Sequence, residues 1–152
     1  MCYEELLLEA DELGLIVAEK PLKYNDGRIK GKRIAIRQDI PTSIEKKCVL
    51  AEELGHFYKN VGNILDQTRT ANRKQEHIAR CWAYNKLITF KQLIDAFESG
   101  CRNRYEFAEH IGVTEQFLLD AMEQFKQKYG NYKKVGDYTF IFYPYYDIMK
   151  DF

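Results

Sequence analysis

The hydrophobic and polar positions of the chain predict one helix, then a small sheet, then a series of helices. Apolar residues at helical spacing indicate a helix over 3–14, and short or alternating apolar runs indicate strands at 15–18 and around 34–36. Helical spacing returns over 43–59 and 72–87, with a polar linker between them, and over two or three shorter segments between about 89 and 129. An aromatic strand is expected at 138–146. This order of elements predicts an α+β fold.

The helix expected over 43–59 contains a group of polar residues in the run Leu50-Ala51-Glu52-Glu53-Leu54-Gly55-His56-Phe57. Glu52 and His56 are four residues apart and project from one face of the helix, which is the spacing at which two side chains hold one metal ion. Glu53 occupies the position of the general base in the HExxH pattern of metalloproteases. Glu52 replaces the first histidine of that pattern, and its carboxylate is an acceptable but harder ligand for zinc.

A third candidate ligand lies on the next predicted helix. Glu76 shares a helical face with Ala79 and Ala83, and small residues there would let this helix approach the preceding one. Gly55 points the same way, because a glycine inside a helix costs about 1 kcal/mol relative to alanine and makes sense where another element comes close. Three protein ligands plus a water form the open arrangement that catalysis requires. The competing interpretation is a solvated acidic face with a structural histidine.

Together these residues resemble the ImmA/IrrE family of metallopeptidases, whose usual signature is HELGH followed by a glutamate on the next helix. The similarity covers nearly the whole chain, from a hairpin at 27–36 through the EELGH helix and the segment Glu76-x-x-Ala79-x-x-Trp82-Ala83 to the aromatic tail. It implies a zincin-like minimal metallopeptidase core, made of a small sheet and active-site helices, over residues 1–88. A helical, helix-turn-helix-like region with a C-terminal strand would follow over 89–152 and pack on that core.

The resemblance also implies the roles of individual residues. Carried over by position, the metal ligands fall on Glu52, His56 and Glu76, and the catalytic glutamate falls on Glu53. Zn²⁺ is the expected ion. Mn²⁺ and Fe²⁺ are alternatives, because two of the three ligands are carboxylates, which suit harder ions.

The function implied by the resemblance is a metal-dependent endopeptidase that cleaves a helix-turn-helix transcriptional repressor, as in the regulation of phages and mobile elements. The substrate is expected to lie extended and to add itself to a sheet edge at Ile34, Ala35 and Ile36, where main-chain hydrogen bonds give affinity with little dependence on side chains. Two alternatives stay open. One is a non-catalytic regulator with a peptidase-like fold that binds a repressor protein, and the other is a DNA-binding helix-turn-helix protein.

A second pattern, over 104–124, has the spacing of a helix-turn-helix. Ala108 lies where two helices would cross, Gly112 lies in the turn, and Leu118 lies on the core face of the second helix. As a DNA-binding signal the pattern is poor, because the second helix would present acids such as Glu115 and Asp120 to the phosphates. A scaffold or substrate-docking role is therefore expected, without specific binding of nucleic acid.

Composition and charge argue against several further classes of protein. The 152 residues include 23 basic and 23 acidic side chains, which argues against a protein held to nucleic acid by bulk charge. No apolar run approaches about 18 residues, so no membrane span is expected. The N-terminus lacks a secretory pattern. The four cysteines form no CxxC pair, and scattered single thiols of this kind fit a cytoplasmic location.

Overall fold

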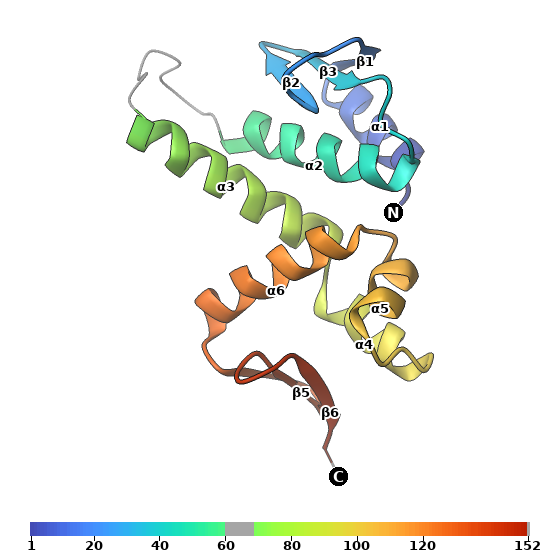
Figure 1. Cartoon of the computed structure of the whole chain (residues 1–152), viewed down its shortest axis with the longest axis vertical. Helices are drawn as coiled ribbons and strands as arrows, with labels where there is room; N and C mark the ends of the chain where they lie inside the picture. The colour runs from blue at the N-terminus through green and yellow to red at the C-terminus, as the bar shows by residue number, and fades with distance from the viewer. Residues whose placement is uncertain (60–68, 152) are drawn as a thin grey trace. The chain divides into compact units, whose positions relative to one another are not determined.

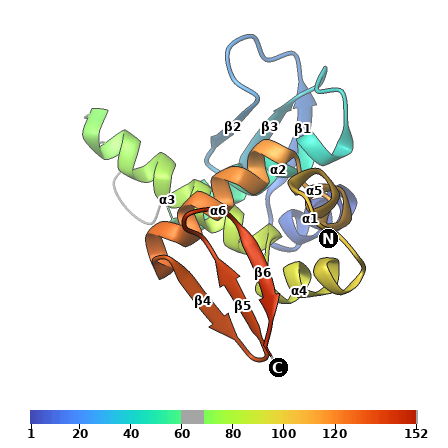
Figure 2. The ribbon, with the colours of Figure 1, turned by 60° about the horizontal axis from the view of Figure 1, so that its bottom comes forward.

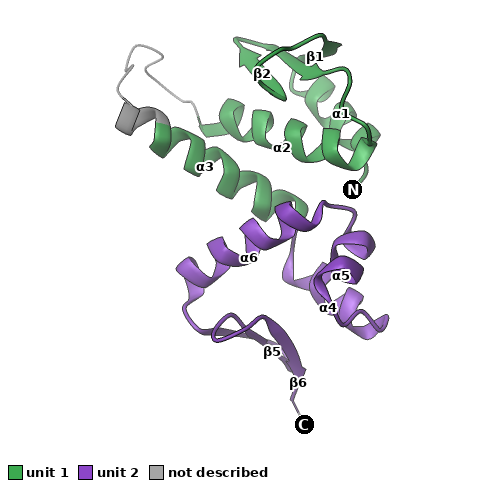
Figure 3. Cartoon of the chain, viewed as in Figure 1, with its two compact units in different colours: residues 1–87 green, residues 88–152 purple. Residues whose placement is uncertain are grey.

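The chain folds as a mixed α+β protein with two compact units. The computed structural model describes residues 1–59 and 69–151. The first unit comprises residues 1–87 and the second residues 88–152 (Figure 3). Within the described ranges there are six helices and two three-stranded sheets, so the expected α+β class is confirmed. None of the helices in these ranges combines the length and the apolar character that crossing a bilayer requires.

The sheet of the first unit combines a hairpin with a parallel strand (Figure 1). Its strands are β1 (Ile16–Lys20), β2 (Gly27–Lys30) and β3 (Arg33–Arg37). β2 and β3 form an antiparallel hairpin, and Gly31 adopts a positive φ of 59° in the turn, which glycine allows at no steric cost. β1 pairs in parallel with the other side of β3, so the strand order is β1-β3-β2.

Three helices complete the first unit: α1 (Tyr3–Glu12), α2 (Ser43–Lys59) and α3 (Arg69–Leu87). Thr42 caps α2, because its hydroxyl accepts a hydrogen bond from the Glu45 backbone N–H at 3.1 Å while the Glu45 carboxylate accepts one from the Thr42 N–H at 3.3 Å. The expected bounds of α2 are confirmed, whereas α3 begins three residues earlier than expected. Most of the expected linker lies outside the described residues.

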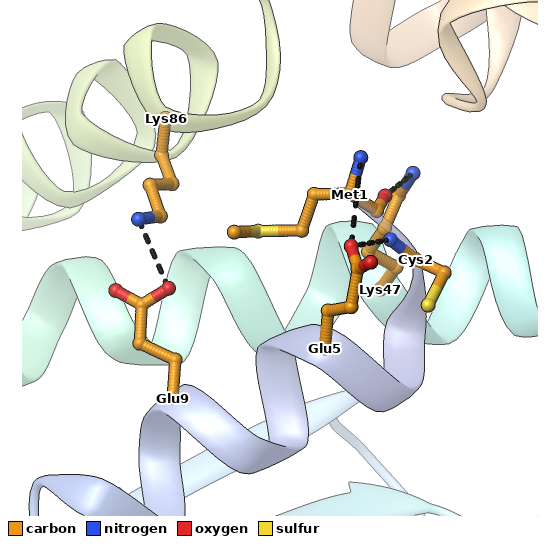
Figure 4. A network of polar contacts seen from close by, with 6 residues as sticks. All are labelled: Met1, Cys2, Glu5, Glu9, Lys47 and Lys86. Carbon is orange, nitrogen blue, oxygen red and sulfur yellow. Dashed lines mark hydrogen bonds and ion pairs between the residues drawn. The ribbon is translucent and has the colours of Figure 1, made fainter.

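Polar contacts join α1 to the other two helices (Figure 4). Lys86 of α3 pairs with Glu9 of α1 at 2.9 Å. Lys47 of α2 is buried, with 4% of its surface exposed, and its Nζ donates a hydrogen bond to the carbonyl of Met1 at 2.9 Å. Burial lowers the pKa of the Lys47 ammonium, because the charged form loses solvation. The N-terminal helix is therefore fixed by ionic and polar contacts as well as by its buried face.

The helices of the second unit begin at well-formed caps. They are α4 (Phe90–Glu98), α5 (Arg104–Ile111) and α6 (Glu115–Tyr129), and the caps are Thr89, Asn103 and Thr114, each of which accepts a hydrogen bond from a backbone N–H of the first turn. α5 and α6 are joined by three residues that begin with Gly112, whose φ is 82°. Ala108 and Leu118 are buried on either side of this turn. Residues 104–124 therefore have the helix-turn-helix arrangement that their spacing predicted.

The C-terminal segment forms a sheet, where a single strand over 138–146 was expected (Figure 2). Its antiparallel strands, in the order β4-β5-β6, are β4 (Tyr132–Val135), β5 (Tyr138–Ile141) and β6 (Asp147–Lys150). β5 is the central strand and carries the buried Phe140, which explains why its apolar pattern was visible in the sequence. β4 and β6 are polar edge strands held mainly by main-chain pairing, so side-chain periodicity did not indicate them.

Candidate active site

Helix α2 carries three of the four residues expected at the site. Glu52 and His56 lie one turn apart, as their spacing requires. Glu52 and His56 are both partly buried, and Glu53 between them is buried, with 8% of its surface exposed. A buried carboxyl on a helix that also carries two partly buried polar residues is unusual for a solvated acidic face, on which acids stay exposed. Their burial favours a built site.

Helix α3 brings Glu76 to this group because α2 and α3 approach closely at Gly55. A Cβ at Gly55 would collide with the backbone carbonyl of Ala79 and would lie 3.0 Å from its carbonyl carbon. Ala79 and Ala83 are buried, with 1% and 0% of their surfaces exposed. The small residues therefore serve the purpose inferred from the sequence: they let the two helix backbones touch.

The close approach places His56 against Glu76. The Nε2 atom of His56 lies 3.1 Å from Oε1 of Glu76, and the His56 side chain is only 13% exposed. Oε2 of Glu76 lies 4.0 Å from Nε of Arg80, one turn along α3. Two atoms that bind one tetrahedral zinc ion at about 2.0–2.2 Å lie roughly 3.3–3.6 Å apart. The spacing of the His56 and Glu76 atoms is close to this separation.

Glu53 lies beneath strand β2, at a place where only a glycine fits. A Cβ at Gly27 would stand 2.9 Å from Oε1 of Glu53 and 2.7 Å from a methyl group of Val49. Burial, followed by the negative charges of Glu76 and Glu52, raises the pKa of the Glu53 carboxyl from 4.5 to about 7. Glu53 can therefore bind and release a proton near neutral pH, as a general base must. From the sequence, Gly27 was expected only to lie at the start of a hairpin. Nothing in the pattern around Gly27 predicted its contact with Glu53.

Two of the three expected metal ligands are placed so that they could bind one ion. Among the residues that the structure describes, no three His, Cys, Asp or Glu side chains form a group that could hold a metal ion. His56 and Glu76 supply an imidazole nitrogen and a carboxylate oxygen at a suitable spacing. Glu52 lies one turn from His56 on the same helix, and at this spacing two side chains project from one helix face. Its role as the third ligand stays a prediction.

The strand predicted to bind the substrate is not at the edge of its sheet, so this part of the prediction is wrong. Ile34, Ala35 and Ile36 belong to β3, which is the central strand of its sheet and is paired with β1 on one side and β2 on the other. Ile34 and Ile36 are also buried, with 2% and 0% of their surfaces exposed. A substrate cannot add to a strand whose main-chain groups are already paired on both sides. Alternating apolar residues mark a strand, but they do not say whether it lies at an edge.

Comparison with known proteins identifies the chain at the level of a family. No curated protein matches it significantly, and no solved structure does. A family model described as Peptidase_M78, IrrE N-terminal-like domain, matches residues 10–123. This match covers α2, α3 and the helix-turn-helix, so it includes every residue of the candidate site. The chain belongs to the ImmA/IrrE family of metallopeptidases.

Proposed function

We propose that this protein is a metal-dependent endopeptidase that cleaves a helix-turn-helix transcriptional repressor. The observation that carries the proposal is the contact between His56 and Glu76 on two helices, with the buried Glu53 beside it. Membership of a metallopeptidase family supports a protein substrate and a metal cofactor in general. The repressor, the phage or mobile-element setting and the cytoplasmic location rest on the resemblance described above and on the scattered cysteines.

Glu52, His56 and Glu76 would hold the ion, with Zn²⁺ expected and Mn²⁺ or Fe²⁺ as alternatives. When bound, such an ion supplies Lewis-acid polarisation of the scissile carbonyl and of a water molecule. The Glu53 carboxylate would take a proton from the attacking water and deliver it to the departing amine. Without an ion the pKa of this group is about 7, and a bound cation nearby would favour the carboxylate form that the first step needs.

The substrate would bind along β2, in place of the central strand β3. β2 is an edge strand, and its Gly27 lies directly against Glu53, whereas the other edge strand, β1, lies on the far side of β3. A peptide added to β2 would use main-chain hydrogen bonds, which suit substrates of varied sequence. It would also pass close to Glu53, as cleavage by this residue requires.

Co-expression with a repressor encoded beside this gene tests the proposal. The wild type is expected to shorten the repressor, as followed by immunoblot. Glu53→Gln keeps the side-chain volume but removes the base, so cleavage should fall about 10²–10⁴-fold while metal content barely changes and the protein stays folded. Glu12→Gln, an exposed substitution on α1, is the matched control and should cleave normally. Full cleavage by Glu53→Gln would show that Glu53 is not the base.

Two observations favour a second candidate function. The chain has Glu52 where the usual signature has histidine, and the described residues contain no ready three-donor group. A non-catalytic regulator that keeps the fold and binds a repressor is consistent with both facts. The two functions differ in the co-expression experiment, because the regulator would co-purify with an intact repressor even when metal is supplied.

A further inference from the structure

The second unit contains a cavity that the proposed peptidase function does not use. Its volume is about 430 Å³, within the range of small-molecule sites. α4, α5, α6 and the C-terminal sheet all contribute to its wall. The wall is mostly aromatic and aliphatic, and includes Leu93, Phe97, Phe107, Leu118, Met122 and Phe140. All lining residues belong to the second unit, so the cavity is complete within it.

The polar residues of the wall are largely engaged with neighbouring protein groups. Nε of Arg104 pairs with the Glu115 carboxylate at 3.3 Å. The Asn103 side chain accepts the capping hydrogen bond of α5 at 2.9 Å, and the Asp147 carboxylate accepts one from the Ile148 N–H at 2.8 Å. The Tyr146 hydroxyl donates to Glu123 at 2.9 Å. These contacts leave an apolar interior with a polar surround, which suits a ligand that is apolar over most of its length.

Arg102 differs from the other charged residues of the wall. Its Nη1 donates hydrogen bonds to the backbone carbonyls of Phe97, at 2.9 Å, and Cys101, at 2.7 Å. Its guanidinium carbon lies over the Phe97 ring, 4.4 Å from the ring centre, so the cation also contacts an aromatic face. No carboxylate in the described ranges pairs with this guanidinium, and its Nε and Nη2 atoms have no protein acceptor there.

We propose that this cavity binds a small apolar monocarboxylate, with the hydrocarbon part inside and the carboxylate on Arg102. A guanidinium fixed at Nη1 presents Nε and Nη2 as a planar pair of donors, which matches the two oxygens of a carboxylate. Of the two arginines in the lining, Arg104 is paired with Glu115, so Arg102 is the one whose charge is available to an anion. The proposal is independent of the peptidase chemistry, since it involves no residue of α2 or α3.

Isothermal titration of the full-length protein with decanoate and with 1-decanol at pH 8 tests the proposal. The two probes share a ten-carbon chain and differ in the head group. Decanoate is expected to bind with one-to-one stoichiometry and at least about tenfold more tightly than 1-decanol, because a charge-assisted hydrogen-bond pair is lost in the alcohol. Equal affinities for the two probes, or no decanoate binding at millimolar concentration, would overturn the proposal.

Two arginine variants locate the carboxylate. Arg102→Gln should weaken decanoate binding about tenfold and leave 1-decanol binding unchanged. Arg104→Gln is the matched control: it removes a guanidinium from the same wall, but one already paired with Glu115, and should change decanoate binding less than threefold. Unchanged decanoate binding in Arg102→Gln contradicts the assignment.

Occupancy of the cavity is tested separately. Leu119→Trp places a large ring at the cavity wall and should abolish binding of both probes. Amide chemical-shift changes in the wild type, which need no variant, should be confined to residues near the cavity between 93 and 148. Shift changes in the first unit would place the ligand elsewhere and refute the proposal. Binding of an apolar peptide from the repressor, with no binding of decanoate, would assign the cavity to a protein partner instead.

Discussion

Two features of its surroundings act on the carboxyl group of Glu53 in the same direction. Its place in α2, between Glu52 and the His56–Glu76 pair, surrounds it with charge, while Gly27 of β2 covers it from the solvent. Both burial and the neighbouring acids disfavour the ionised form and raise its pKa to about 7. A buried carboxyl with this pKa lowers the free energy of unfolding at neutral pH, but it is suited to proton transfer. This combination is typical of residues that serve in chemistry.

The raised pKa of Glu53 predicts how stability depends on pH in metal-free protein. The folded state binds the proton more tightly than the unfolded state, so this contribution is favourable below about pH 4.5 and is lost as the pH rises to about 7. Above that pH the ionised group lowers the free energy of unfolding by about 3 kcal/mol. Urea unfolding with a chelator present should show Glu53→Gln gaining stability over the wild type across this window, while Glu12→Gln does not. A constant difference between variant and wild type would contradict the shift.

We expect Glu52 to determine how strongly the proposed metal site prefers zinc. Glu52→His restores two imidazole ligands and should retain Zn²⁺ at chelator concentrations that strip the wild type, because the softer nitrogen suits zinc better than a carboxylate oxygen does. Elemental analysis after graded chelation measures this. His56→Ala, which removes one of the three proposed ligands, should lose zinc in both backgrounds. A wild type that holds zinc as tightly as Glu52→His would show that Glu52 is no weaker a ligand.

At the scale of elements, the contact between α2 and α3 positions the site. Gly55 meets the main chain of Ala79, so the separation of the helices is set by backbone atoms that no rotamer change can move. β2 also approaches α2 closely, because a Cβ at Gly27 would stand 2.7 Å from a side-chain atom of Val49 and 2.9 Å from one of Glu53. Two glycines therefore bring one helix and one strand into contact with α2, on which most of the site residues lie.

Gly55→Ala tests the contact between the helices. Helix propensity alone predicts a gain of about 1 kcal/mol, but the added methyl group would collide with the Ala79 carbonyl. We expect a net loss of about 1–3 kcal/mol in the free energy of unfolding, measured by urea denaturation, together with weaker metal binding. Adding Ala79→Gly should not restore stability, because the collision involves the backbone. A stabilised Gly55→Ala protein would refute this contact.

At the scale of the whole molecule, local features could be predicted from the sequence and features that depend on distant parts of the chain could not. The bounds of α2, the role of Gly55 and the turn at Gly112 followed from local rules of spacing, helix cost and φ. The central position of β3 did not, because pairing partners are non-local, and the residues of β1 pair with residues 17 positions further along the chain. Lys47 was missed for a similar reason: its charge suggests exposure, and only the fold supplies the Met1 carbonyl that accepts its hydrogen bond.

The charge of the whole molecule and its helix-turn-helix lead to a further prediction. The chain is neutral overall, and α6 exposes Gln116, Asp120 and Glu123. We therefore expect no sequence-specific binding of duplex DNA in gel-shift titrations with the operator of the neighbouring repressor. Specific binders reach dissociation constants of about 10⁻⁸–10⁻¹¹ M, and an affinity in that range would restore the DNA-binding alternative.

The backbone contact at Gly55 also bears on the order of events during maturation. In many small metalloproteins the ligands meet only when the ion arrives, so the apo chain stays unfolded. Here the spacing of His56 and Glu76 follows from a contact between two main chains that needs no ion. Folding and loading thus become separate steps. A cell could hold this protein folded without metal, and start the proposed peptidase activity by delivering metal alone.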